Sequence, residues 1–274
     1  VWTKKTKLGA YYPLFYADAG GNTNSQIQFL DTNTLRLFHQ VSGVDTFHLT
    51  TTQVFRDTSA WYHIVVSVDT TQATSTDRLK MYINGVQVTA FSATLYPSQN
   101  SEATVNSTSS HYVGYVPAGP YYYDGMLAEV NFIDGQALDP SYFGFTDPLT
   151  NTWRPKKYVN TIALPGDGAG RVGFGTNGFY LPFDNIGDDV NAGNDQSGRG
   201  NNWTLNNFVT TAAGINTNPN IMPDSPSGIS YGSGATAGIG TTTLMSRPNN
   251  YCTLNPLRPS QMGGGSATIS NGNL

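Results

Sequence analysis

The sequence has little charge, a single cysteine and no long apolar segment. Only 12% of its 274 residues are Asp, Glu, Lys or Arg, and the formal net charge is -4. The Lys and Arg residues are scattered, so nucleic acid and anionic membranes are not expected as partners. A lone cysteine, Cys252, excludes an internal disulfide framework. No apolar run approaches the roughly 20 residues that cross a bilayer, and no signal-peptide pattern opens the chain.

Gly, Thr, Asn, Ser and Tyr are abundant instead. This composition suits short strands joined by many turns and few long surface helices. Hydrophobic residues make up 38% of the chain and aromatic residues 12%, which is enough to build a core. We therefore predict an all-β protein. Because the chain opens on Val1, we also expect it to be part of a longer protein.

The clearest local signal is a β-hairpin. Leu79, Met81 and Ile83 alternate with Lys and Tyr and so point to one face of a strand. Asn84 and Gly85 then supply the two positive-φ residues of a type I′ turn. The sequence therefore predicts two adjacent antiparallel strands joined by a two-residue loop.

Further strands are predicted along the first half of the chain. They cover residues 13–17, 25–30, 34–40, 59–69, 111–116 and 125–133. Many short antiparallel strands separated by turn residues predict a β-sandwich or jelly roll. Asp139 as N-cap, Pro140 at the first helical position and Gly144 after the end predict one short helix that closes this domain.

The chain divides into four predicted parts. They are a sandwich domain over residues 1–146, a Pro- and Gly-punctuated connector over 147–177, a strand segment over 178–208 and an extended, mostly irregular C-terminal arm over 209–274. The arm has few large apolar side chains, too few to bury a core of its own. The segment 178–208 either completes the first sandwich or opens a second one.

Three motifs occur in the order of a known fold family. They are "SAWYHIVVSVD" (59–69), "LKMYINGVQV" (79–88) and "YDGMLAEVNFIDGQALDPSYFG" (123–144). Together they resemble the laminin-G-like branch of the concanavalin A-like lectin jelly rolls, over about residues 1–144. This resemblance implies an antiparallel β-sandwich of the concanavalin A-like type.

A narrower resemblance covers most of the chain. "VFRDTSAWYHIVVSVDTTQAT", "LAEVNFIDGQAL", "DQSGRGNNWTLNNF" and "NNYCTLNPL" are similar to segments of bacteriophage virion proteins, many from marine cyanophages. This resemblance implies a tail fibre or capsid-attached fibre on the virion surface. It also implies a homo-oligomer with other virion chains as partners, and a host surface glycan as a further partner.

One departure from the family concerns its opening strand. In the family a strand precedes the segment that corresponds to residues 2–9, and here that strand is absent, so an open sheet edge is expected. Residues 178–207 resemble this opening strand and its turn. We therefore predict that they fill the vacant edge or begin a second sandwich.

Three carboxylates, Asp124, Glu129 and Asp134, raise the question of catalysis. Glycan-cleaving relatives of this fold carry acidic residues at even spacing, which aims two carboxylates into one groove. Glu129 and Asp134 are five apart, so an unbroken strand sends them to opposite faces, and the two Asp-Gly pairs suit turns. We predict no catalytic residues and no enzyme activity. The alternative is a secreted or cell-surface module of the same fold that binds or cleaves carbohydrate.

The sequence also contains groups that could bind a metal. His39, His48, His63 and His111 lack metal-type spacing and are expected to be half-buried strand residues. No cofactor is predicted, with calcium as a minor alternative because the stretch 184–195 is rich in oxygen ligands. Its candidate ligands are Asp184, Asp188, Asp189 and Asp195. A surface turn rich in Asp, Gly and Asn explains this stretch more simply.

An aromatic cluster provides the candidate contact site. Tyr115, Tyr121, Tyr122 and Tyr123 surround a Pro- and Gly-containing loop, where some of the rings cannot face the core. Exposed tyrosines stack on sugars or fill subunit contacts. Subunit contact or simple packing is favoured over a sugar platform, because protein interfaces use tyrosine routinely.

Overall fold

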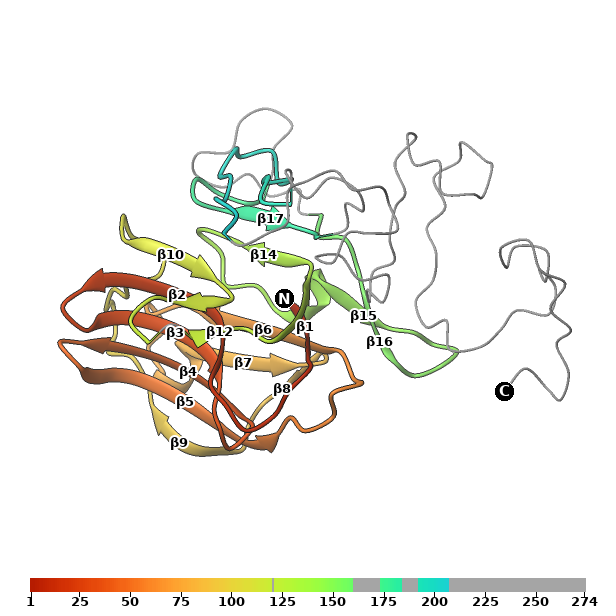
Figure 1. The fold of residues 1–274 in the computed structure, drawn as a ribbon, viewed down its shortest axis with the longest axis horizontal. Coiled ribbons are helices and arrows are strands. Elements are labelled where there is room, and N and C mark those ends of the chain that lie inside the picture. The colour runs from red at the N-terminus through yellow and green to blue at the C-terminus, as the bar shows by residue number, and fades with distance from the viewer. Residues whose placement is uncertain (120, 160–172, 184–191, 207–274) are drawn as a thin grey trace, which may run out of the picture.

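The structure is a computed structural model that describes residues 1–119, 121–159, 173–183 and 192–206. Its centre is a pair of antiparallel sheets (Figure 1). No α-helix occurs within the described ranges. The prediction of an all-β antiparallel sandwich is confirmed. The predicted arm over residues 209–274 and Cys252 lie outside the described residues.

The first of the two sheets, which we call sheet B, has six strands. In spatial order they are β10 (Ser110–Val113), β2 (Tyr12–Gly20), β3 (Thr23–Phe29), β4 (Thr34–Val41), β5 (Val44–Val54) and β9 (Phe91–Leu95). The strands predicted over 13–17, 25–30 and 34–40 are β2, β3 and β4. The sequence prediction missed β5 and β9.

The second sheet, which we call sheet A, has five strands. In spatial order they are β13 (Gly125–Ala128), β1 (Trp2–Lys5), β6 (Tyr62–Val68), β7 (Leu79–Ile83) and β8 (Val86–Gln87). The strand predicted over 59–69 is β6, which pairs with β1 on one side and β7 on the other.

Short elements complete the fold. They are the ladders β11 (Tyr115–Val116) with β12 (Tyr121–Tyr122), β14 (Val130–Phe132) with β17 (Phe179–Leu181), and β15 (Gly144–Thr146) with β16 (Trp153–Pro155), and the 3-10 helices η1 (Ser75–Asp77) and η2 (Pro140–Tyr142). The predicted helix start is confirmed on η2, where the Asp139 side chain accepts a hydrogen bond from the Ser141 backbone N–H.

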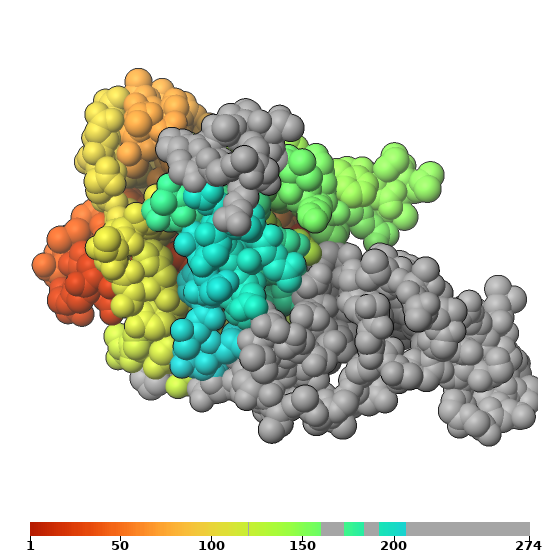
Figure 2. Space-filling model, turned by 90° about the horizontal axis from the view of Figure 1, so that it is seen from above, coloured from red at the N-terminus to blue at the C-terminus, as the bar shows by residue number. Residues whose placement is uncertain are grey.

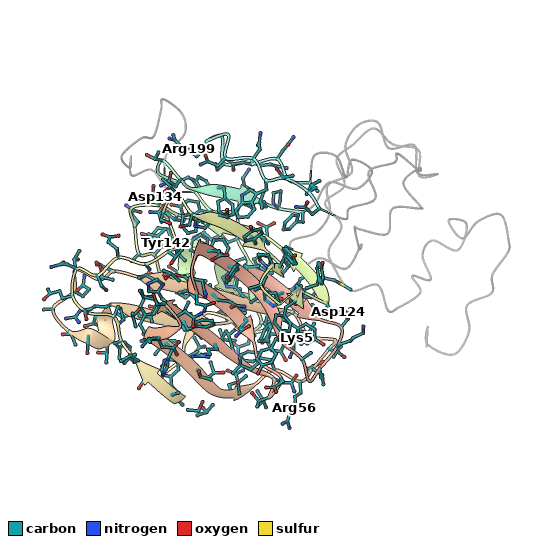
Figure 3. All side chains as sticks on the ribbon, turned by 60° about the vertical axis from the view of Figure 1, so that its left-hand side comes forward. Lys5, Arg56, Asp124, Asp134, Tyr142 and Arg199 are labelled. Carbon is teal, nitrogen blue, oxygen red and sulfur yellow. The ribbon has the colours of Figure 1, made fainter. Side chains whose placement is uncertain are left out.

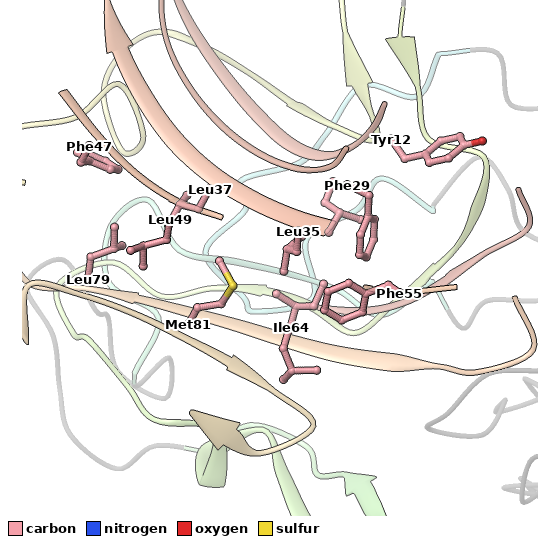
Figure 4. Packing of buried hydrophobic residues seen from close by; sticks show 12 residues of the cluster. Tyr12, Phe29, Leu35, Leu37, Phe47, Leu49, Phe55, Ile64, Leu79 and Met81 are labelled. Atoms are coloured by element: carbon pink, nitrogen blue, oxygen red, sulfur yellow. The ribbon is translucent and has the colours of Figure 1, made fainter. Parts of the chain in front are cut away.

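The core lies between the two sheets. Alternate residues of each strand point inward, and their aliphatic and aromatic side chains interdigitate (Figure 4). The buried cluster comprises Tyr12, Leu14, Phe29, Leu35, Leu37, Phe47, Leu49, Phe55, Ile64, Leu79, Met81 and Ile83. Sheet B is curved, and its core side chains lie on the convex side (Figure 4). The backbone of the sheet is therefore concave on its other side.

The predicted hairpin forms as expected. Leu79, Met81 and Ile83 are buried in the core, and β7 pairs with β8. Asn84 and Gly85 have φ values of 49° and 81°, as a type I′ turn requires.

The strand predicted over 125–133 is broken in the structure. Glu129 has a φ of 51°, which ends β13 and starts β14 in a new direction. A non-glycine residue costs about 1 kcal/mol or more in this region, so its surroundings must hold it there. The Tyr180 hydroxyl donates to Glu129 Oε2 at 2.7 Å, and the Glu129 N–H donates to the Pro182 carbonyl.

The segment predicted to fill an edge or begin a second sandwich lies on the first one. Phe179–Leu181 (β17) pairs with β14, the continuation of edge strand β13. Phe179 stacks on Phe132 at 5.5 Å and meets the edge of Trp203 at 4.8 Å. Within the described residues, this segment therefore extends the edge beside β13.

Part of the predicted connector forms a hairpin that packs on the outer face of sheet A. The Trp153 ring stacks on His63, and its Nε1–H donates to His63 Nδ1 at 3.0 Å. Burial lowers the pKa of His63 to about 2, so its ring is neutral and Nδ1 can accept. A Cβ on Gly85 or Gly144 would lie 2.5 or 2.4 Å from the Trp153 ring, so both positions need glycine.

Lys5 is fully buried at one end of the sandwich (Figure 3). Its Nζ donates to Asn33 Oδ1 at 3.2 Å and lies 4.6 Å from the centre of the Phe29 ring. Burial lowers the pKa of Lys5 from 10.5 to about 8, because the interior disfavours the charged form. Lys5 is thus a buried cation held by one amide and one aromatic face.

We expect Lys5→Met to raise the free energy of unfolding by about 1 kcal/mol at pH 7, because an apolar side chain replaces a buried charge. Between pH 8 and 10.5 unfolded Lys5 binds a proton that folded Lys5 has lost, so the wild type gains stability as pH rises. The advantage of the variant should shrink over this range. Urea denaturation at pH 7 and pH 9.5 measures the difference in free energy of unfolding between the variant and the wild type. A difference that grows with pH would contradict the lowered pKa of Lys5.

Candidate functional site

The side of sheet B that faces away from the core carries polar and aromatic side chains. In β4, Arg36 and Phe38 alternate with core residues Leu35 and Leu37 and so point away from the core. We call this surface the concave face. Its residues are Tyr16, Asp18, Asn24, Gln26, Gln28, Arg36, Phe38, Gln40, Asp45, His48, Thr50 and Tyr112, as the strand registers place them.

One row of the concave face crosses five strands. The registers place Tyr112 opposite Tyr16, Tyr16 opposite Gln26, Gln26 opposite Phe38, and Phe38 opposite His48. Tyr16 is 3% exposed and Phe38 is 7% exposed although neither belongs to the core between the sheets. The side chains of this row therefore pack against their neighbours across the strands.

The polar groups of the face hold one another in place. Gln26 Nε2 donates to Gln28 Oε1 at 2.8 Å. Burial raises the pKa of Tyr16 to about 12, with the charge of Asp18 as the next cause, so its hydroxyl stays protonated at neutral pH. The buried amide and hydroxyl groups of the face are thus held in fixed positions.

A charged group sits at the far end of this row. Arg36 Nη2 and His48 Nδ1 both contact Asp45 Oδ2, the latter at 2.9 Å. The Arg36 guanidinium also lies 4.5 Å from the centre of the Phe38 ring. The side chains of Arg36, Asp45 and His48 keep 28, 25 and 22% of their exposure. Solvent therefore reaches this part of the face.

The tyrosines predicted as contact residues continue the row at its other end. The Tyr112 ring lies 6.0 Å from Tyr16 and 5.8 Å from Tyr115, and Tyr115 stacks on Tyr122 at 4.9 Å. We call Tyr16, Tyr112, Tyr115 and Tyr122 the tyrosine series. The structure therefore joins two of the predicted residues to the concave face.

The other two predicted tyrosines lie elsewhere. Tyr121 is exposed and lies 5.8 Å from the Tyr11 ring. Tyr123 packs edge-on against Tyr12, and its hydroxyl contacts Thr3 Oγ1, so it takes part in the interior of the sandwich. Burial raises the pKa of Tyr123. The contact role predicted for these two residues stays a prediction.

A cleft of about 1170 Å³ lies beside the tyrosine series. One wall comes from residues 106–128, including Tyr112, Tyr115 and Tyr122, and the other from residues 192–206, including Trp203. Figure 2 shows residues 192–206, in cyan, against the yellow segment that contains β10. The lining of the cleft mixes aromatic and apolar side chains with polar ones, among them Asn106, Asp124 and Asn201. The concave face differs in that its polar groups lie in register across neighbouring strands.

The three carboxylates weighed for catalysis do not converge. Asp124 contacts Thr6 Oγ1 and pairs with Lys7 Nζ at 2.8 Å, which holds its pKa below the ordinary value. Asp134 lies in another part of the molecule, well apart from Asp124 in Figure 3.

Asp134 belongs to a network of amide groups. Its carboxylate accepts from Asn106 Nδ2 at 2.8 Å and from the Asn177 N–H at 3.1 Å. Glu129 accepts from Tyr180, as described above. Each of the three carboxylates thus connects neighbouring segments of the fold.

Of the four candidate calcium ligands, only Asp195 lies within the described residues. Both of its oxygens accept hydrogen bonds from the chain: Oδ1 from the Tyr180 and Ser197 N–H groups, and Oδ2 from Ser197 Oγ and the Asn201 N–H. These bonds hold a turn. The other candidate ligands, Asp184, Asp188 and Asp189, lie outside the described residues. In the described part of the chain, no three His, Cys, Asp or Glu side chains are grouped to hold a metal ion.

The histidines have separate surroundings. His39 is buried, with Nδ1 3.0 Å from Ser25 Oγ, and His111 Nδ1 lies 2.7 Å from the Ser109 carbonyl. Burial lowers the pKa of both. His63 lies under Trp153, and His48 is on the concave face.

Sequence reasoning missed most of the concave face. Gln26, Gln28 and Arg36 occupy the outward positions of strands that were predicted correctly, and their alternation was visible in the sequence. The missing information was that these strands are neighbours and that the sheet curves away from the core on their side.

Within the described residues, no helix is both long enough and apolar enough to span a membrane.

The architecture and this face define a lectin-like β-sandwich. Residues 1–141 match the model of the Concanavalin A-like lectin/glucanases superfamily, and the chain belongs to this family. The resemblance stated from the sequence motifs is confirmed at this level. No curated protein matches the sequence.

Solved structures with a similar fold include a carbohydrate-binding module, CBM40, of the Ruminococcus gnavus IT-sialidase. Its complex with α2,3-sialyllactose is 14% identical, with a TM-score of 0.32, over 45% of this chain and 66% of that chain. Its complex with α2,6-sialyllactose is 12% identical, with a TM-score of 0.31, over 45% and 67%. This chain thus spans about two thirds of the module, and nothing about its own ligand follows from this similarity.

Proposed function

We propose that this protein is a non-enzymatic glycan-binding module and that the concave face is its binding surface. The observation that carries the proposal is the row from Tyr112 to His48, in which aromatic rings and amides lie side by side across five strands. Its end residues, Tyr112 and His48, are partly exposed and would make the first contacts, over the buried Tyr16, Gln26 and Phe38. Aromatic faces stack on sugar rings, and amides both donate to and accept from hydroxyl groups. A curved sheet face that combines the two suits a carbohydrate.

The absence of catalysis is part of the proposal. Hydrolysis of a glycosidic bond uses two carboxyl groups on either side of that bond. On the concave face Asp45 is paired with Arg36, and Asp18 accepts from the Gly20 N–H. These two carboxylates have structural partners, which supports a binding role over a cleaving one.

The biological setting that we propose is the virion surface of a bacteriophage. There the module would belong to a tail fibre or capsid-attached fibre, form a homo-oligomer with other virion chains and attach to a host glycan. The similarity of "VFRDTSAWYHIVVSVDTTQAT" and "DQSGRGNNWTLNNF" to phage virion proteins supports this setting. A secreted or cell-surface carbohydrate-binding module is the alternative, and the same binding surface would serve it.

A glycan array probed with the full chain tests the binding function. We expect binding to a defined set of oligosaccharides, and chromatography of the bound glycans after incubation should show them uncleaved. No binding above background to any glycan would overturn the binding proposal. New reducing ends would overturn the non-enzymatic part.

The setting needs a separate test. An antibody raised against the chain should label intact phage particles from a culture that carries the gene, as seen by immunogold electron microscopy. Label on cell surfaces or in the medium, with unlabelled particles, would favour the alternative.

A further inference from the structure

We infer that the glycan bound on the concave face is an uncharged oligosaccharide that lies across the strands. This inference rests on the proposed function and names the class of ligand. Three observations support the inference. They are the charges of the face, the partners of its one guanidinium and the length of its row.

The charges of the face disfavour an acidic sugar. Asp18 and Asp45 stand against one guanidinium, Arg36, which leaves one net negative charge when His48 is neutral. A carboxylate or sulfate on the ligand would meet this excess beside partly buried charges, where like charges repel more strongly than in water.

The single guanidinium has its own partners. Arg36 Nη2 contacts Asp45 Oδ2, and the guanidinium packs on the Phe38 ring. Recognition of an anion by arginine usually places its N–H groups directly on the anion. An acidic ligand would have to compete with Asp45 for them.

The remaining groups suit hydroxyls. Gln26 and Gln28 are joined by one hydrogen bond and are both less than 9% exposed, so their amides are held in fixed orientations. Tyr16 keeps its proton at neutral pH, as described above. Neutral donors and acceptors of this kind match the hydroxyl groups of a neutral sugar.

The length and direction of the row favour a chain of several sugars. Five neighbouring strands at a spacing of about 4.8 Å place the ends of the row about 19 Å apart. The tyrosine series lengthens it through Tyr115 and Tyr122. Because the row crosses the strands, an oligosaccharide that contacts all of it also crosses them.

Titration calorimetry with matched oligosaccharides tests the charge preference. Each pair, taken from the sugars bound on the array, differs only in the oxidation of the C6 hydroxymethyl groups to carboxylates. We expect the acidic member to bind about tenfold more weakly than the neutral one. Equal or tighter binding of the acidic member would overturn the inference and leave the proposed function standing. Binding of neither class would remove the proposed function and this inference with it.

Two variants test whether charge causes the preference for neutral over acidic ligands. Asp45→Asn removes one negative charge and frees Arg36, so it should strengthen acidic binding about tenfold and raise the ratio of acidic to neutral affinity. Asp18→Asn is the matched control, because it removes a charge without freeing Arg36, and its effect on acidic binding should be smaller. If neither variant changes the preference, charge is not its cause.

The length of the ligand is tested with neutral oligomers of two to six sugars. The affinity should rise with each added unit until the row is filled. A disaccharide that binds as tightly as the hexamer would overturn the placement across the strands.

Discussion

Tyr112→Ala is expected to weaken glycan binding about 30-fold, which corresponds to about 2 kcal/mol of binding free energy. Tyr112 lies between Tyr16 and Tyr115, so its removal interrupts the tyrosine series in the middle. Loss of a central aromatic ring removes stacking area and opens the neighbouring rings to water. Titration calorimetry of the wild type and the variant, with the strongest ligand from the array, measures the effect.

Two further variants control for this substitution. Tyr112→Phe keeps the ring and should retain affinity within about threefold, because stacking uses the ring face. Tyr82→Ala removes a half-buried tyrosine from β7 of sheet A and should leave binding unchanged. Equal affinity of Tyr112→Ala and the wild type would place the binding surface away from the tyrosine series, and also away from the adjoining cleft, because Tyr112 lines that cleft too.

Trp153→Ala is expected to lower the free energy of unfolding by about 3 kcal/mol, the usual cost of deleting a large packed ring. The substitution removes the stack on His63, the hydrogen bond to His63 Nδ1 and the packing against Gly85 and Gly144. It also leaves a buried histidine nitrogen without its donor, which adds to the cost. In a chain of this size the melting temperature should fall by about 6–12 °C.

Thermal and urea denaturation followed by circular dichroism measure this loss. Trp153→Phe keeps an aromatic ring without the N–H donor and should recover about half of the stability. Phe145→Ala, on the same hairpin, is the matched control, because its ring is already 47% exposed and its removal should cost less than about 1 kcal/mol. A loss of less than about 1 kcal/mol in Trp153→Ala would mean that the hairpin does not depend on this contact.

The contacts that these two substitutions remove differ in how well they could be predicted from the sequence. Tyr112 was not itself predicted as a contact residue, but the adjoining Tyr115, Tyr121, Tyr122 and Tyr123 were, because they surround one loop. The contact between Trp153 and His63 was not foreseen, since the residues are 90 positions apart and Trp153 lies in a stretch predicted as connector. A Pro- and Gly-rich stretch gives no local signal of which surface it packs against.

The sequence by itself determined the class of fold and the elements whose geometry is local. The turn at Asn84 and Gly85, the alternation of Leu79, Met81 and Ile83, and the cap at Asp139 each depend on a few consecutive residues. For such elements the chemistry of neighbouring side chains is enough.

Only the tertiary structure decided where the candidate site lies. It placed Tyr112 opposite Tyr16, almost a hundred residues earlier, and it joined Gln26 and Phe38 to the same row. It also broke the predicted strand at Glu129, whose left-handed backbone is held by β17. Strand register and sheet curvature arise from packing between distant segments, and alternation within one strand shows which side chains share a face without showing which strand lies beside it.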